Sequence, residues 1–370
     1  MTFLFQIAGR TLWARTCRYC GGMPRDRRHL RRRGAALLVV LAVPLGLMAC
    51  SSTSDAGPPT PSPTVATPTP PAGPTTIATL IENEREEPEV TLLGPAAPVG
   101  KETAQALSYS SGGLEITGVL RLPAGDGPFP LVVAVHGSVD PADYESGRDM
   151  VPEQRALLDA GYAVLATDLR GYAGSDPAEV DGTISVDPGF GWATVLDWGM
   201  ALDVVNALAV ARSGQLPQVD PSSVGLLGHS LGGLLSLDAA VVAPELAELV
   251  IVLAAPTSDL ATAVASAVDP DSPEWELLAE TVGTPDDNPE YWRDISPVTF
   301  FSRAQAPLLL VHGSADDVAP ARWAQETKDA WLAAGGRAEL VLLEGGDHHL
   351  EPRRAEASAV IVQAFDAVLR

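Results

Sequence analysis

The stretch VGLLGHSLGG at residues 224–233 decides the fold class of this 370-residue chain. Its first residues form a short apolar run typical of a strand, and the apolar residues after Ser230 have the spacing of a helix. Between them lies a G-x-S-x-G motif, in which Gly228 and Gly232 lack a Cβ and let a strand and a helix approach closely. We therefore expect Ser230 at a tight strand–turn–helix junction, where the helix dipole and the Leu231 amide favour a developing oxyanion.

Strand-like and helix-like segments alternate on both sides of this junction. Expected strands are 114–122, 131–135, 162–167, 224–227, 249–254, 307–311 and 338–343, and expected helices are 190–211, 231–242, 321–334 and 351–369. Continuous apolar runs indicate strands buried on both faces, whereas 114–122 alternates and indicates an antiparallel opening. The pattern predicts an α/β fold with a mostly parallel, doubly wound sheet and helices on both faces. In such sheets functional groups gather at the carboxyl ends of the strands.

A candidate acid follows the expected strand 307–311. The loop HGSADDVAP at 312–320 places two carboxylates where one can accept a hydrogen bond from an imidazole and fix its tautomer. The Val and Pro that follow favour Asp316 over its neighbour Asp317.

A candidate base follows the last expected strand. The loop EGGDHHL at 344–350 offers two histidines, and the Gly-Gly-Asp before them favours His348 over His349. The chain order of nucleophile, acid and base is then Ser230, Asp316, His348, which is the order of one serine-hydrolase fold in particular.

A second oxyanion donor is expected after the strand 131–135. There the chain reads His136-Gly137-Ser138, and the glycine permits a sharp turn. The backbone amide of Ser138 can then face the nucleophile, whereas the side chain of His136 is expected to be structural.

Four stretches resemble the α/β-hydrolase superfamily, and within it the prolyl oligopeptidase-like branch with its acylaminoacyl and dipeptidyl peptidases and dienelactone-hydrolase-like esterases. They are GPFPLVVAVHGS at 127–138, DLRGYAGSD at 168–176, GLLGHSLGG at 225–233, and DISPVTFFSRAQAPLLLVHGSADDVAP at 294–320 continuing to LVLLEGGDHHL at 340–350. The resemblance covers about 260 residues. It implies an α/β-hydrolase fold, a Ser230, Asp316 and His348 triad, and an oxyanion hole of the Ser138 and Leu231 amides.

The resemblance favours a serine hydrolase that cleaves carboxylic esters through an acyl-enzyme on Ser230. The peptidases of the branch carry a β-propeller that residues 51–105 cannot hold, and dienelactone hydrolases use Cys where this chain has Ser230. A peptidase with acylaminoacyl or dipeptidyl activity is the alternative, followed by a non-catalytic lipid-anchored binding protein on a hydrolase scaffold and by acyl transfer to an alcohol. The expected partner is a small-molecule ester or a short peptide, and no cofactor or metal motif is found.

Residues 256–300 lie between two expected strands and contain Trp275, Tyr291 and Trp292. In this fold an insertion at that point can cap the site. The alternative is a set of helices that only pack against the domain, and the sequence favours neither.

The N-terminal region has the order of a secretory signal peptide. Residues 25–33 contain six Arg and precede an apolar run, 34–49, that is shorter than the ~20 residues of a membrane span. The run ends in Leu-Met-Ala before Cys50, which resembles the lipobox of bacterial lipoproteins. A plain signal anchor with a chance Cys is the alternative.

The lipobox resemblance implies that residues 1–49 are a signal peptide, with Met23 as an alternative start. Cys50 would then be lipidated and would hold the exported protein on the outer face of the bacterial cytoplasmic membrane.

Three further segments complete the expected organisation. Residues 50–76 form a tether rich in Pro, Thr and Ser that cannot bury a core, residues 77–105 are read as acidic and irregular, and 106–370 form the hydrolase domain. The chain holds 47 acidic and 24 basic residues, a net charge of -23, and residues 1–50 contain nine of the basic ones. The part of the chain after residue 50 is therefore strongly acidic, which argues against binding to nucleic acid.

Overall fold

The computed structural model describes residues 76–176, 199–268 and 270–370. The predicted signal peptide, Cys50, the tether up to residue 75 and the first part of the predicted helix 190–211 lie outside the described residues. No helix in the described part of the chain is both long and apolar enough to cross a bilayer.

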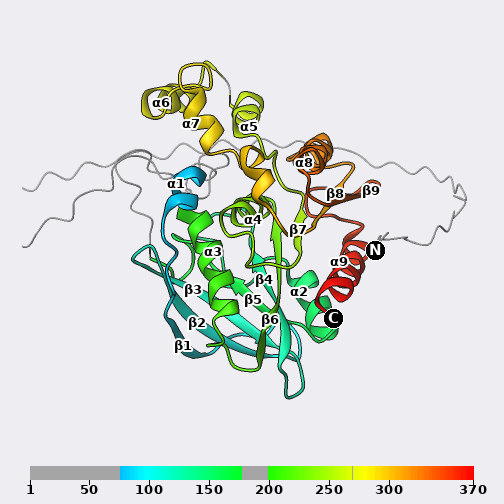
Figure 1. Ribbon diagram of the computed structural model, residues 1–370. Coiled ribbons are helices and arrows are strands. Elements are labelled where there is room, and N and C mark those ends of the chain that lie inside the picture. Colours follow the sequence, from blue (N-terminus) through cyan, green and yellow to red (C-terminus); the bar gives the residue numbers. More distant parts are fainter. Residues whose placement is uncertain (1–75, 177–198, 269) are drawn as a thin grey trace, which may run out of the picture. The chain divides into compact units, whose positions relative to one another are not determined.

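The described strands form a nine-stranded sheet in the order β1-β2-β3-β5-β4-β6-β7-β8-β9 (Figure 1). The strands are β1 (Val90–Pro95), β2 (Thr103–Ser111), β3 (Leu114–Leu122), β4 (Phe129–Val135), β5 (Ala163–Thr167), β6 (Val219–His229), β7 (Val250–Leu253), β8 (Leu308–Gly313) and β9 (Ala338–Leu343). In this order, the pairs β1–β2, β2–β3 and β3–β5 are antiparallel, and every following pair, from β5–β4 to β8–β9, is parallel. The prediction of a mostly parallel sheet with an antiparallel opening is confirmed.

Helices pack on both faces of the sheet. They are α1 (Ile77–Glu82), α2 (Val151–Asp159), α3 (Gly199–Arg212), α4 (Leu231–Val242), α5 (Leu260–Ala267), α6 (Pro273–Thr281), α7 (Pro289–Asp294), α8 (Ala321–Ala333) and α9 (Arg354–Leu369), with a 3-10 helix, η2 (Pro297–Arg303). Helices α2 and α9 pack against each other on one face, and α3, α4 and α8 cover the other (Figure 1).

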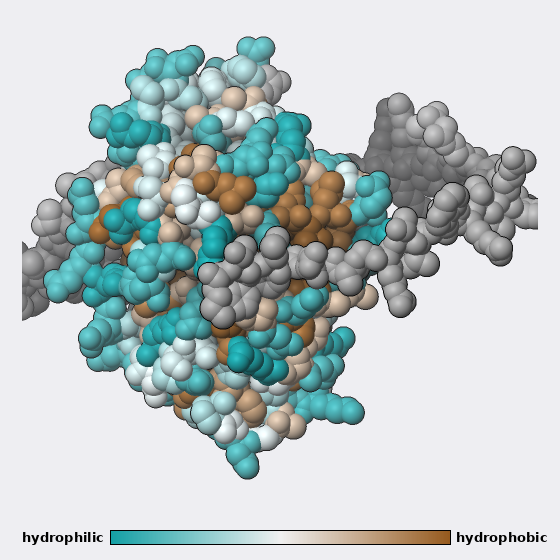
Figure 2. Space-filling view, turned by 45° about the vertical axis from the view of Figure 1, so that its right-hand side comes forward, coloured by the Kyte–Doolittle hydropathy of each residue, from teal (hydrophilic) through white to brown (hydrophobic). Residues whose placement is uncertain are grey.

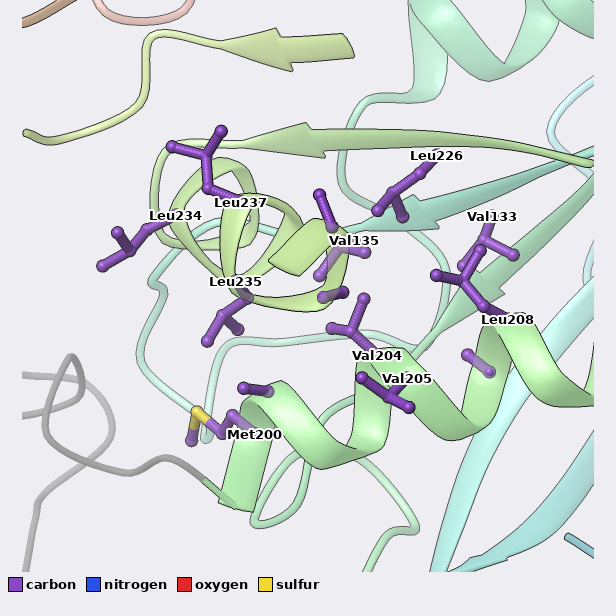
Figure 3. Packing of buried hydrophobic residues seen from close by; sticks show 14 of the residues in the cluster. Val133, Val135, Met200, Val204, Val205, Leu208, Leu226, Leu234, Leu235 and Leu237 are labelled. Carbon is purple, nitrogen blue, oxygen red and sulfur yellow. The ribbon is translucent and has the colours of Figure 1, made fainter. Parts of the chain in front are cut away.

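Alternate side chains of each central strand enter two different cores, as the two-residue period of a strand requires. In β4, Val133 and Val135 pack toward α3 and α4, whereas Val132 and Ala134 pack toward α2 and α9. Figure 3 shows the first core, where leucines of α4 and valines of α3 meet the strands. Every residue of α4 is buried, which explains why apolar residues and glycines occupy all sides of this helix apart from Ser236 and Asp238. These two cores fix β6 and α4, and with them the junction that carries Ser230.

The segment 77–105 is not irregular, and this part of the prediction is wrong. It contains α1 and β1 and the start of β2, so the fold begins by residue 76 rather than at 106. Thr76 and Thr79 form a capping box that starts α1. Strand β2 pairs with β3 along its whole length, from Thr103 opposite Leu122 to Ser111 opposite Leu114. The strand contains many small and polar residues, so long-range pairing rather than local apolar pattern makes it a strand.

Candidate active site

Ser230 lies at the strained junction between β6 and α4. Its φ of 52° and ψ of −118° belong to a region that side chains seldom adopt. The strain is held by close packing, because a Cβ at Gly228 would overlap the carbonyl oxygen of Gly232, and one at Gly232 would overlap that of Val135. The Ser230 amide also donates to the Leu253 carbonyl at 2.8 Å. The two glycines of the motif are therefore required by contact distances as well as by backbone freedom.

The three side chains predicted for catalysis form one hydrogen-bonded chain. The Nε2 atom of His348 lies 2.9 Å from the Ser230 hydroxyl oxygen, and its Nδ1 atom lies 2.9 Å from Oδ2 of Asp316. With the proton on Nδ1, the free Nε2 can accept the hydroxyl proton while the carboxylate stabilises the imidazolium that results. The arrangement suits nucleophilic attack by Ser230 with general base assistance.

Asp316 is buried and held as an anion by several donors. Its Oδ1 accepts from the backbone amides of Val318 at 2.9 Å and Ala319 at 2.8 Å. Its Oδ2 lies 3.1 Å from Nε2 of a buried histidine, His312. Burial by itself would raise the pKa of Asp316, but the hydrogen bonds from His312, His348 and the Ala319 amide hold that pKa well below its usual range. The carboxylate beside His348 is that of Asp316, the residue that the sequence favoured, whereas the neighbouring Asp317 is exposed.

The loop that carries His348 is fixed by its own backbone and by the loop of Asp316. The Asp347 carboxylate accepts from the amides of His349 and Glu351, at 2.9 Å and 2.8 Å. A Cβ at Gly313 would overlap the Gly346 carbonyl, so the two loops touch backbone to backbone. This contact gives a structural reason for the Gly-Gly-Asp that precedes His348, whereas His349 lies exposed beside it.

The two predicted oxyanion donors line the same cavity as Ser230. Leu231 is the first residue of α4, so its N–H has no acceptor within the helix. Ser138 lines the cavity from the opposite loop, whose preceding residue, Gly137, donates its amide to Asp149 Oδ2 at 2.8 Å. Asp149 thus holds the loop that contains Ser138, and the sequence analysis did not identify it.

The cavity measures about 680 Å³ and is lined by both apolar and charged residues. The apolar lining residues include Val139, Pro256, Leu260, Ala263, Val318 and Trp323. The lining also includes the exposed Asp143 and Glu145 with Arg148, which pairs with Glu145 at 3.5 Å. Hydrophobic patches interrupt the mostly hydrophilic surface seen in Figure 2.

The segment 256–300 contains one helix that lines the cavity and another that packs into the core. Helix α5 contributes Leu260 and Ala263 to the cavity wall. Helix α7 instead buries Trp292, which donates from its indole N–H to the Gly283 carbonyl at 3.0 Å and belongs to the core. Trp275 packs only partly buried against that core.

Two family profiles match the chain, each over just under half of its length. The profile of the acetyl xylan esterase family matches residues 79–259, and that of the prolyl oligopeptidase family matches residues 190–365. The two matches overlap around Ser230.

The known proteins that resemble this chain include both esterases and peptidases. An uncharacterized peptidase of Bacillus subtilis, YuxL, is 25% identical over 250 residues, which cover 64% of this chain and 34% of that protein. The chain therefore spans about a third of the length of this relative.

Solved structures share the fold. Acetyl xylan esterase 1 from Thermoanaerobacterium sp. JW/SL YS485 superposes with a TM-score of 0.56 at 18% identity and covers 78% of this chain and 92% of its own. The acetyl xylan esterase from Paenibacillus sp. R4 gives 0.55 at 22% identity with the same coverage. The acylaminoacyl peptidase of Pyrococcus horikoshii gives 0.53 at 19% identity and covers 75% of this chain and 49% of its own.

Proposed function

We propose that this chain, which has the α/β-hydrolase fold, is a serine hydrolase that cleaves carboxylic esters through an acyl-enzyme on Ser230. The observation that carries the proposal is the unbroken hydrogen-bond chain from the Ser230 hydroxyl through His348 to Asp316 at the wall of a cavity. A non-catalytic binding protein on this scaffold would not need these three groups in register.

The proposed reaction uses each group in turn. The Ser230 oxygen bonds to the ester carbonyl carbon while His348 Nε2 takes the hydroxyl proton, and the Ser138 and Leu231 amides stabilise the oxyanion. His348 returns the proton to the departing alcohol, which leaves an acyl group on Ser230. A water molecule, deprotonated by the same Nε2, then attacks the acyl carbon. The bond from that carbon to the Ser230 oxygen breaks, His348 returns the proton to the Ser230 oxygen, and the carboxylic acid is released.

Esters are proposed ahead of amides because of the relatives that span the whole domain. The two acetyl xylan esterase structures are matched over 92% of their chains, which supports a short acyl group on an alcohol as the substrate class. The cavity adds a constraint, because the exposed Asp143 and Glu145 beside a single Arg148 make it unfavourable for anionic esters.

A serine peptidase is the second candidate. It is supported by the prolyl oligopeptidase profile over 190–365, which contains all three residues of the hydrogen-bond chain, and by YuxL. Amide hydrolysis requires that His348 protonate a nitrogen that is a poorer leaving group than an alcohol.

The two candidates are separated by kcat/KM on a nitrophenyl acetate and on matched aminoacyl and dipeptidyl nitroanilides. The ester should be cleaved readily and the anilides poorly. Efficient cleavage of an anilide, with the ester no better, would replace the esterase by the peptidase.

We also propose that the protein is exported and anchored by a lipid on Cys50. The support is the sequence alone, namely the Arg-rich and apolar segments and the Leu-Met-Ala-Cys that ends at residue 50. Cys50→Ser should release the protein from the membrane fraction or leave an unprocessed precursor. An unchanged mature mass and membrane yield would show that the anchor does not use Cys50.

A further inference from the structure

His229, the residue before the nucleophile, lies between two loops of the site. The residue is only 7% exposed, and its two ring nitrogens face two different partners. Nε2 lies 3.1 Å from the backbone carbonyl oxygen of His348, and Nδ1 lies 3.5 Å from Oδ2 of Asp149. Both partners are acceptors. A neutral imidazole has one N–H, so only the imidazolium form of His229 can donate to both.

Asp149 connects this imidazole to the oxyanion loop. Its Oδ2 accepts from the Gly137 amide at 2.8 Å, and its Oδ1 accepts from the Met150 amide at 2.8 Å. Asp149 and His229 therefore link the loop that presents the Ser138 amide, the nucleophile junction and the loop that carries His348.

The charges around His229 favour its protonated form. Burial by itself would lower the pKa of His229, but the hydrogen bond and the negative charge of Asp149 outweigh it and raise that pKa above its ordinary value. The other titratable groups that face the ring are His348, His349 and Arg354, of which Arg354 acts in the opposite direction and is itself paired with a glutamate.

We infer that His229 is a positioning residue of the proposed esterase, whose imidazolium holds the His348 backbone carbonyl and thereby keeps His348 Nε2 at hydrogen-bond distance from Ser230. The side chain of His348 is already tied to Asp316 at its other nitrogen. Without the hydrogen bond from His229 to the backbone carbonyl, the His348 ring can tilt about its hydrogen bond to Asp316. A displacement of about 1 Å costs on the order of 10²-fold in rate. The inference depends on the proposed hydrolase function.

Three substitutions separate the two contacts of His229. His229→Asn keeps an amide N–H near the Nδ1 position and can reach Asp149, and His229→Gln keeps one near the Nε2 position and can reach the His348 carbonyl. His229→Phe removes both donors and keeps a planar ring. We expect His229→Phe and His229→Asn to lower kcat on nitrophenyl acetate by about 10–100-fold with KM within about threefold, and His229→Gln to stay within about fivefold of the wild type.

The pH dependence of kcat distinguishes a positioning role of His229 from a purely structural one. Below its raised pKa the His229 ring donates from both nitrogens. As pH rises through that pKa one N–H is lost, and because the Asp149 carboxylate is the stronger acceptor, the remaining proton stays on Nδ1 and Nε2 no longer donates to the His348 carbonyl. Wild-type kcat should therefore decline on the alkaline side, whereas the Gln variant, which does not titrate, should lack this decline. A thermal melt of each variant checks that it is folded.

The outcomes distinguish this inference from the function on which it rests. If the wild type neither hydrolyses the ester nor reacts with a fluorophosphonate, the proposed function fails. If the wild type is active but the Gln variant is no better than the Asn variant, or the alkaline decline survives in the Gln variant, then His229 does not position His348 and the inference is overturned. Recovery by Gln but not by Asn, with the alkaline decline lost, supports it.

Discussion

The Asp316 carboxylate has a different donor set at each oxygen, which makes Asp316→Asn a sharp test of the site. Oδ1 accepts two backbone amides, from Val318 and Ala319, and lies 3.1 Å from Nδ1 of His348. Oδ2 lies closer to that nitrogen, at 2.9 Å, and 3.1 Å from Nε2 of His312. The asparagine can place its carbonyl oxygen at only one of these positions. An amide N–H that loses its acceptor costs about 1–3 kcal/mol, so the oxygen should stay on the two backbone amides.

This orientation places the NH2 group of asparagine where Oδ2 now lies, 2.9 Å from Nδ1 of His348. Two donors cannot face each other at this shorter contact, so the tautomer with Nδ1 as the acceptor and the proton on Nε2 is favoured. That nitrogen is 2.9 Å from the Ser230 oxygen and can no longer take its proton. Loss of the correct tautomer lowers kcat by up to about 10⁴-fold, or about 5 kcal/mol of transition-state stabilisation.

The assay is kcat and KM for nitrophenyl acetate, with a thermal melt to show that each variant is folded. The matched control is Asp317→Asn, which removes the same charge from the adjacent, exposed position. We expect a large loss of kcat at nearly constant KM for Asp316→Asn and a change below about threefold for the control. Equal losses in the two variants, or a larger loss for Asp317→Asn, would refute the reasoning.

Three other changes test parts of the fold. Asp238 is fully buried on α4 with no hydrogen-bond partner in the described part of the chain, and burial raises its pKa well above the usual value. Because Asp238 ionises in the unfolded state but not in the folded one, folding stability falls as pH rises above about 4. Asp238→Asn should therefore raise the melting temperature more at pH 8 than at pH 5. An equal rise at both pH values would contradict this. Gly228→Ala places a Cβ onto the Gly232 carbonyl and should abolish soluble, active protein, whereas a folded and active variant would show that the junction can relax. Burial would raise the pKa of Asp149, but contacts with His229 and the Gly137 amide depress it. Asp149 therefore contributes fully to folding stability above its unfolded-state pKa of about 3.9, and this contribution is lost as pH falls below that value. Asp149→Asn should flatten the acid side of a plot of melting temperature against pH. An unchanged acid side would show that Asp149 does not have this role.

The residues of the site were predictable because each follows a strand with a strong local pattern. The apolar run before Gly228 and the mostly apolar helix after Ser230 define the junction without any long-range information. The choice of Asp316 over Asp317 and of His348 over His349 rested on loop spacing, and the hydrogen-bond chain of the structure includes the favoured member of each pair.

What the sequence did not reveal depends on contacts between distant residues. Asp149 acts on Gly137 and His229 across loops, and no motif surrounds it. Helix α2 begins after Met150, which has a left-handed backbone and offers no side-chain cap, so the usual N-cap signal is absent. Strand β2 is weakly apolar and depends on its pairing with β3.

The central claim is that Ser230 forms a covalent acyl-enzyme, and a fluorophosphonate probe tests it most directly. The purified wild type should gain the mass of one phosphonyl group on Ser230 and lose ester hydrolysis in proportion, because the probe takes the place of the acyl group. Ser230→Ala should stay folded, take up no label and hydrolyse nitrophenyl acetate about 10³–10⁶-fold more slowly. Label on another residue, or substantial turnover by the folded Ser230→Ala variant, would contradict the account.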